Sequence, residues 1–257
     1  AMLAAAVGPA IRKHDAFAMP DLAGMLGHAR AALAIGLPAI AANIATPIGN
    51  AIVTREVARF GTEAVAGMAV IGRLMPLAFA VIFALSGAIG PIIGQNAGAG
   101  RADRVRAAFR DAVLFTGIYV LIASAVLFIL RQPIAALFNA EGETLSLILL
   151  FCGPLALMSF FNGVIFVANA SFNNLGRPLY STAVNWGRHT LGTWPLVVLG
   201  AAWYGAPGAL VGQALGGVAF AGVAILLARR VMDRMDRAEA DPFVPHSRWQ
   251  SLAGRNK

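Results

Sequence analysis

Charged residues and cysteine are scarce in this chain of 257 residues. Only 12% of its residues are charged and 58% are hydrophobic, whereas a soluble domain has about 25% charged residues. So few polar side chains cannot cover a surface that faces water, which argues against a soluble protein. The single cysteine, Cys152, excludes a disulfide within the chain. No cysteine and histidine residues are spaced like metal ligands, so we expect no metal site and no cofactor.

The twelve acidic residues are also few, and none lies deep inside the long apolar runs described below. A transporter coupled to protons or sodium usually keeps a carboxylate within the membrane. The runs likewise hold no pair of carboxylates and no nucleophile beside a base, the residues that catalysis would need. We therefore predict that the chain is not an enzyme and that these runs supply no coupling carboxylate.

Long apolar runs are what the chain has in abundance. A helix that crosses a bilayer needs about 20 predominantly apolar residues. The sequence therefore predicts an all-α membrane protein, a bundle of six transmembrane helices whose partner is the lipid bilayer. Pro47 and Pro76 lie inside the first two helices, where we expect them to bend the chain. The six predicted spans are residues 31–54, 64–95, 108–130, 145–172, 180–203 and 209–228.

Basic residues, almost all of them arginine, give the chain a net charge of +8. They lie between the apolar runs, so we attribute them to membrane orientation and not to nucleic-acid binding. If residues 1–30 are cytoplasmic, the cytoplasmic side holds fifteen arginine and lysine residues and the other side only Arg55, Arg59 and Arg131. Both termini are therefore predicted to be cytoplasmic, with residues 229–257 forming a charged, partly disordered tail. The fifteen are Arg12, Lys13, Arg30, Arg101, Arg104, Arg106, Arg110, Arg177, Arg229, Arg230, Arg234, Arg237, Arg248, Arg255 and Lys257.

Small residues recur every four positions in two of the runs. Ser86, Gly90, Gly94 and Gly98 follow this spacing near the end of the second run, and so do glycines 212 and 216 in the last run. Positions four apart lie on one face of a helix. A stripe of small side chains lets another helix approach closely in a membrane, so we predict close helix packing along both stripes.

Polar residues inside the apolar runs are the candidate functional residues. An asparagine or arginine that faces lipid leaves its donors unpaired, at a cost of several kcal/mol. These side chains should therefore face the interior of the bundle or a water-filled cavity. The alternative is that they form hydrogen bonds between helices and only hold the bundle together. The candidates for lining a substrate cavity are Asn43, Thr46, Asn50, Arg73, Asn162, Asn169, Asn185, Arg188 and His189.

Residues 30–230 resemble the second half of a transporter of the multidrug and toxic compound extrusion (MATE) family. The most specific segments are PAIAANIATPIGNAIVT at 38–54 and GQNAGAGRADRVR at 94–106, followed by PIAALF at 133–138 and NNLGRP at 173–178. One difference is Met75, where many relatives have a glutamate, and methionine can neither bind a cation nor titrate. This difference argues against ion coupling through the second helix.

The resemblance implies that the chain is one lobe of a twelve-helix MATE-type inverted V, in which the two six-helix lobes move by alternating access. Residues 31–228 would be the C-terminal lobe, and residues 1–30 the end of a preceding helix and the inter-lobe loop. Such transporters export organic cations or other toxic compounds in exchange for protons or sodium. The implied partners are a small organic substrate and an N-terminal six-helix lobe of the same or another chain, in a bacterial inner (plasma) membrane.

Two other functions fit the sequence. One is a lipid-linked saccharide flippase of the same superfamily, although its cavity would be markedly cationic and only Arg73 and Arg188 lie in the spans. The other is an inert fragment or half-transporter, because six spans with one polar face need a partner for that face. Ala1 before Met2 fits a fragment.

Overall fold

The structure is a computed structural model in which residues 22–240 are described. Most of the predicted inter-lobe loop and the end of the predicted tail therefore lie outside the described residues. The chain divides into two compact units, Ala1–Pro38 and Ala39–Lys257, and the arrangement below is that of the second unit. The helices are α2 (Leu22–Ala58), α3 (Thr62–Ala78), α4 (Ala80–Gly98), α5 (Ala102–Leu137), α6 (Gly142–Leu150), the π-helical turn η1 (Phe151–Leu155), α7 (Ala156–Asn174), α8 (Pro178–Gly187), the π-helical turn η2 (Arg188–Thr193) and α9 (Trp194–Ala240).

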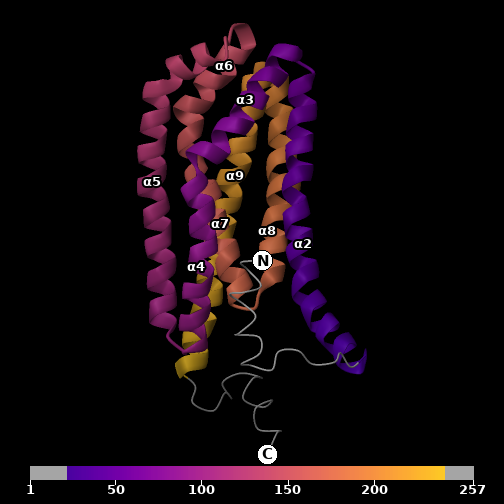
Figure 1. Cartoon of the computed structure of the whole chain (residues 1–257), viewed down its shortest axis with the longest axis vertical. Coiled ribbons are helices and arrows are strands. Elements are labelled where there is room, and N and C mark those ends of the chain that lie inside the picture. Colours follow the sequence, from indigo (N-terminus) through magenta and orange to yellow (C-terminus); the bar gives the residue numbers. More distant parts are fainter. Residues whose placement is uncertain (1–21, 241–257) are drawn as a thin grey trace, which may run out of the picture. The chain divides into compact units, whose positions relative to one another are not determined.

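The described part of the chain has four helical segments that are long and apolar enough to cross a membrane. They contain five of the six predicted spans, in whole or in part, and the first predicted span lies in α2, which is not among the four. The chain is thus an all-helical, multi-pass membrane protein (Figure 1). The four segments are Ala80–Gly98, Ala102–Leu137, Gly142–Asn174 and Pro178–Met235.

The last segment contains two antiparallel legs, because its backbone leaves helical geometry at Tyr204 and Gly205. Gly205 has a φ of 65°, in the left-handed region that glycine adopts without strain. Glycines hold the legs together: a side chain at position 212 would overlap the carbonyl of Leu196, and one at 216 would lie 2.7 Å from the backbone of Gly192. The predicted stripe in the last run therefore does pack closely. Among the three glycines of the other stripe, positions 90 and 94 lie against the side chain of Asn174, whereas a side chain at position 98 would meet nothing within 4 Å.

The predicted second span, residues 64–95, is wrong as a single helix, since it is interrupted at Phe79 (φ −117°, ψ 20°). The break comes three residues after Pro76, which lies inside α3. The amide of Ile82 donates to Phe79 O at 3.0 Å, although its regular partner four residues earlier would be Ala78. The carbonyl of Ala78 instead accepts a hydrogen bond of 2.8 Å from the hydroxyl of Tyr119 on α5.

Two other predicted boundaries also differ from the structure. Helix α2 begins at Leu22, so residues 22–30 are helical and not a loop. Helix α5 covers Ala102–Leu137 and contains Pro133, so much of the predicted connection after residue 130 continues the helix. Proline does not end either helix, because neighbouring helices in a bundle can satisfy the carbonyls that it frees.

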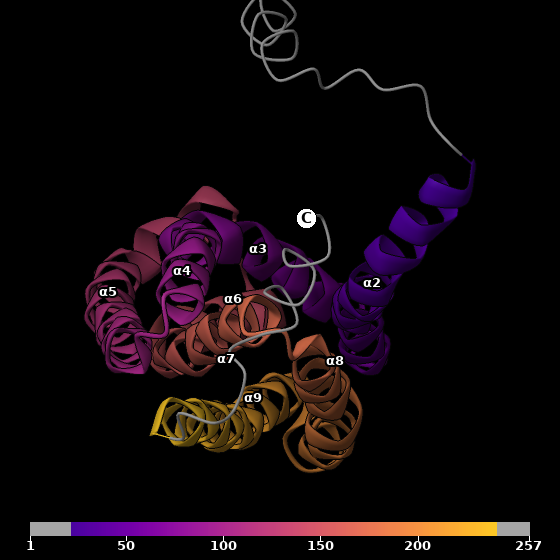
Figure 2. The ribbon, with the colours of Figure 1, turned by 90° about the horizontal axis from the view of Figure 1, so that it is seen from below.

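Helix α7 lies between α4, α5, α8 and α9 and contacts all four (Figure 2). Its residues 163–165 and 167–169 are buried, because these neighbours surround it. Gly163 permits the closest approach, since a side chain there would overlap Thr116 on α5 and lie 3.1 Å from Ile82 on α4. Polar residues on α7 are therefore held inside the bundle.

The two ends of the bundle carry different charge. At one end, Arg106 on α5 forms an ion pair of 2.9 Å with Asp233 on α9; at the other, the amide of Glu143 donates to the Glu63 carboxylate at 3.0 Å. Among residues 39–235, the first end holds eight arginines and three aspartates, net +5, and the second three arginines and four glutamates, net −1. The first set is Arg101, Arg104, Arg106, Arg110, Arg177, Arg229, Arg230, Arg234, Asp103, Asp111 and Asp233, and the second is Arg55, Arg59, Arg131, Glu56, Glu63, Glu141 and Glu143.

Candidate functional site

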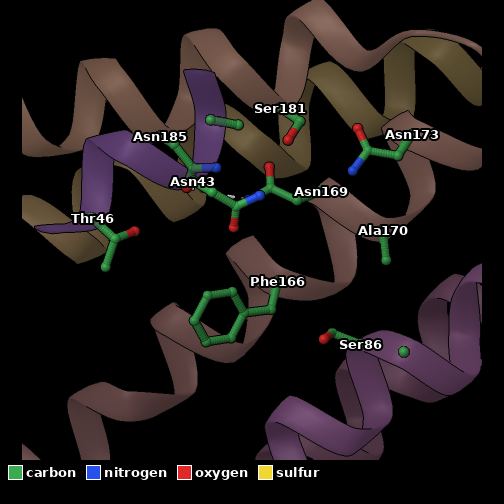
Figure 3. A pocket seen from close by; sticks show the side chains of 11 residues that line it. Asn43, Thr46, Ser86, Phe166, Asn169, Ala170, Asn173, Ser181 and Asn185 are labelled. Carbon is green, nitrogen blue, oxygen red and sulfur yellow. Dashed lines mark hydrogen bonds between the residues drawn. The ribbon is translucent and has the colours of Figure 1, made fainter. Parts of the chain in front are cut away.

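A pocket of about 260 Å³ lies between α2, α4, α7 and α8. Asparagine carboxamides and hydroxyl groups supply its polar lining, and Phe166 supplies an aromatic ring (Figure 3). No charged side chain lines it among the described residues. The lining residues are Ala42, Asn43, Thr46, Ser86, Gly87, Phe166, Asn169, Ala170, Asn173, Ser181 and Asn185. The pocket is polar but electrically neutral.

Three carboxamides from three helices converge in this pocket: Asn43 from α2, Asn169 from α7 and Asn185 from α8 (Figure 3). Asn169 Nδ2 donates to Asn185 Oδ1 at 3.3 Å, longer than the usual 2.9–3.0 Å. Asn169 is only 9% exposed, and its Oδ1 has no hydrogen-bond partner in the described part of the chain. An unpaired buried acceptor costs about 1–3 kcal/mol, a cost that a hydrogen-bond donor would remove if the carboxamide turned toward it.

Helical periodicity explains why each element offers several residues to the pocket. Positions three or four apart share a helix face, as Asn43 and Thr46 do on α2 and Ser181 and Asn185 do on α8. The indole Nε1 of Trp186 donates to Ala41 O at 2.9 Å and ties α8 to α2. The pocket is therefore built on regular helices that are joined beside it.

Helix α2 also lies close to η2, the π-helical turn that follows α8. Gly49 permits this contact, because a side chain there would overlap the imidazole of His189. His189 is 1% exposed, and neither ring nitrogen has a partner in the described part of the chain. This histidine of η2 packs against α2 and is not one of the residues that line the pocket.

Phe166 belongs to an aromatic pair that connects α7 with α4. Its ring centroid lies 5.3 Å from that of Phe83, with the planes tilted by 44°, a separation typical of favourable aromatic pairs. Ser86, one turn after Phe83, also lines the pocket, and its hydroxyl donates to Phe83 O at 2.8 Å. The side of the pocket nearest α4 is thus formed by residues that already contact one another.

The structure brings four of the nine predicted site residues together in the pocket: Asn43, Thr46, Asn169 and Asn185. The other five lie elsewhere. Asn50 and Arg73 are exposed on α2 and α3. Asn162 is half-buried on α7, and its Oδ1 lies 3.5 Å from where a side chain at Gly217 would begin. Arg188 is half-buried at the start of η2, and His189 packs against Gly49.

Both prolines predicted to bend helices are exposed. Pro47 lies within α2, and Pro76 lies within α3 shortly before the break at Phe79. Ser181 was not among the predicted site residues, although its position four residues before Asn185, on the same helix face, could have indicated it. Ser86 was predicted only as a packing residue.

The MatE family model matches residues 38–199. Among curated proteins, the chain is 36% identical over 216 residues to an uncharacterized 21 kDa protein from the iaaL 5' region of Pseudomonas savastanoi, covering 80% of this chain and 68% of that protein. It is 28% identical to a FAD transporter of Shewanella oneidensis, covering 80% of this chain and 46% of that protein. It is also 28% identical to the probable multidrug resistance protein NorM of Aromatoleum aromaticum, covering 69% of this chain and 38% of that protein.

The fold is similar to that of the Vibrio cholerae MATE transporter VcmN. A crystal structure of a VcmN variant matches with a TM-score of 0.80 and 24% sequence identity, covering 90% of this chain and 53% of that one. The chain thus spans about half the length of this transporter and 46% of the FAD transporter.

Proposed function

The chain belongs to the MatE family of transporters, which are not enzymes, and on that premise we propose that it forms the C-terminal half of an antiporter that exports small organic compounds. Its partner is an N-terminal six-helix lobe of the same or another chain. Transport follows alternating access, in which the two lobes rock around a shared cavity. The half-length match to VcmN supports one lobe of a twelve-helix transporter.

The six crossings of this lobe are α2, α3 with α4, α5, α6 with α7, α8 with the first leg of α9, and its second leg. Residues 31–228 form the lobe, with residues 1–30 joining it to the other half and residues 229–257 as a tail. The end with net charge +5 faces the cytoplasm, because positively charged loops stay on that side. Both termini are then cytoplasmic, in the inner membrane of a bacterium.

The observation that carries the proposal is the neutral pocket between α2, α4, α7 and α8. Asn43, Thr46, Asn169 and Asn185 line it, and the unpaired Asn169 oxygen is buried there. Such a polar site within apolar helices is costly unless it serves function. We assign these four residues to substrate contact.

The other five predicted site residues have different proposed roles. Asn50 and Arg73 are exposed on α2 and α3, and we assign them to the cavity shared with the other lobe. Asn162, Arg188 and His189 lie outside the pocket, and we assign them to helix packing around it. Bending at Pro47 and Pro76 contributes to the rocking motion.

Coupling to protons or sodium is assigned to the other lobe. Between the two charged ends of the described bundle, the ionisable side chains include Arg73 and Arg188 but no carboxylate. A cation therefore has no anionic partner among these spans. This lobe supplies substrate contacts and is one of the two lobes whose rocking opens the cavity to either side of the membrane.

A flavin nucleotide is a second candidate substrate. One relative is named a FAD transporter, and the carboxamides of the pocket could bind the amide-like edge of a flavin ring. The saccharide flippase is less well supported, because such a flippase would have a markedly cationic cavity, whereas no charged residue lines this pocket.

Export can be tested in a bacterial strain that lacks its own efflux pumps. The complete gene product that carries this chain should raise resistance to toxic organic compounds and speed their loss from loaded cells. The chain expressed alone, without an N-terminal lobe, should do neither. If the complete product leaves resistance and efflux unchanged for drugs and flavins alike, the transporter proposal is wrong and the inert alternative stands.

A further inference from the structure

We propose that the pocket takes a neutral, planar ring that carries a hydrogen-bond donor and an acceptor side by side, as in a cyclic amide or imide. The inference rests on the proposed function and specifies the chemical class that the pocket recognises. It concerns the part of the ligand held by α2, α7 and α8.

The absence of charge among the lining residues selects against an ionic group. A cation or anion that leaves water needs an opposite charge or it loses several kcal/mol of solvation free energy. The pocket supplies only carboxamides, hydroxyls and apolar groups. Arg73 and Arg188 are not among its lining residues. A neutral ligand group therefore binds here more favourably than an ionic one.

Carboxamides select for a donor beside an acceptor. Each asparagine side chain offers an N–H donor and a carbonyl acceptor in one plane, which is the complement of an amide edge. The bond between Asn169 and Asn185 is long at 3.3 Å, so little is lost when either carboxamide turns to a ligand. Asn169 Oδ1 has no partner among the described residues and is itself buried, so it gains a partner when the carboxamide turns toward a ligand that offers an N–H.

Pocket size and Phe166 select for a flat ring. A cavity for a whole drug-sized molecule is about 300–1,000 Å³, and this one is about 260 Å³. It therefore holds one ring system and not an entire large ligand. The Phe166 ring, which lines the pocket, offers a surface on which a flat ring can stack.

A matched pair of probes tests the donor requirement. 1,8-Naphthalimide is neutral, planar and fluorescent, and its N-methyl derivative carries a methyl group in place of the imide hydrogen, so it cannot donate at that nitrogen. The chain, purified in lipid nanodiscs, is titrated with each probe while fluorescence is recorded. We expect naphthalimide to bind about fivefold more tightly, the effect of roughly one hydrogen bond.

Substitutions locate that preference. Asn169→Leu should bind the two probes equally, because the acceptor is gone. Asn162→Leu is the matched control: it lies on the same helix outside the pocket and should keep the preference. Asn169→Asp places a negative charge in the pocket. It should weaken the binding of naphthalimide and strengthen the binding of ethidium, a cation. Thermal melting checks that each variant is folded.

Three results would overturn the inference: equal affinity of the unaltered chain for both probes, binding of neither, or a preference that survives Asn169→Leu. Its failure is distinct from failure of the proposed function, which the efflux assay reports. Export of organic cations without discrimination between the probes would reject the ligand class alone. Discrimination without any export would reject the transporter proposal alone.

Discussion

The neutral pocket and a larger hollow between α3 and α5 lie in the same bundle but have opposite linings. The larger one, about 410 Å³, is formed almost entirely by apolar side chains, and its one hydroxyl, that of Tyr119, is already bonded to Ala78 O. The smaller one, about 260 Å³, contains a buried oxygen without a partner in the described part of the chain. The smaller pocket, which we propose as the recognition site, thus differs from the larger hollow in the polarity of its lining and not only in volume. The larger hollow is lined by Leu74, Leu77, Ala78, Tyr119, Ile122, Ala123, Val126 and Leu127.

The larger hollow also lies beside the break between α3 and α4. Ala78 is both part of its lining and the acceptor of the Tyr119 hydrogen bond. An apolar space next to an interrupted helix gives the two segments room to move relative to each other. We assign this hollow to bending of the lobe, in contrast to the neutral pocket.

Filling the neutral pocket should have the largest effect. Gly87 lines it, and a side chain at this position would meet nothing within 4 Å at its first carbon. Gly87→Phe should therefore fold but abolish naphthalimide binding in nanodiscs and export by the complete gene product. The control is Gly98→Phe on the same helix, which also has open space but is not a lining residue. Normal binding by Gly87→Phe would contradict the assigned roles of the two hollows.

Removing the Tyr119 hydroxyl should have a smaller effect, on stability. Tyr119→Phe leaves the Ala78 carbonyl without its side-chain partner, a loss of about 1 kcal/mol, which corresponds to a melting temperature lower by about 2–4 °C. Thermal unfolding in detergent measures this, and probe binding should be unchanged. Tyr180→Phe is the control, since no hydrogen bond of its hydroxyl is found in the described part of the chain and its ring packs against Phe172. If both variants melt at the same temperature as the unaltered chain, the Tyr119 hydroxyl does not stabilise the break between α3 and α4.

Much of this comparison could be predicted from helical periodicity, but only within each helix. The spacing of Asn43 and Thr46 predicted that they share one face, and both line the pocket. The burial cost of asparagine predicted that this face lies in the bundle interior or in a wet cavity, and both residues are exposed. Positions 162 and 169 are seven apart and share one stripe of α7, yet Asn162 lies near Gly217 on α9 whereas Asn169 lines the pocket. A stripe shows which residues point the same way and not which neighbour each one meets.

A bend at Pro76 was expected from the sequence, but the interruption at Phe79 itself could not be placed, for a related reason. Pro76 permits a bend but also occurs in continuous helices, as Pro91 does in α4 and Pro133 in α5. What distinguishes the site is the hydroxyl of Tyr119, which is 41 positions away and satisfies the freed carbonyl. Contacts between distant helices decide where a membrane helix is interrupted.

Protection of an introduced thiol tests the central claim most directly. Cys152 is the chain's one cysteine and is fully buried, so Ser86→Cys in the pocket wall supplies the reactive thiol. Its reaction with a small maleimide is timed in nanodiscs with and without naphthalimide, beside Gly98→Cys outside the pocket. The neutral pocket as recognition site predicts that naphthalimide slows labelling at position 86 and leaves position 98 unchanged. An unchanged rate at position 86, or equal slowing at both positions, would contradict it.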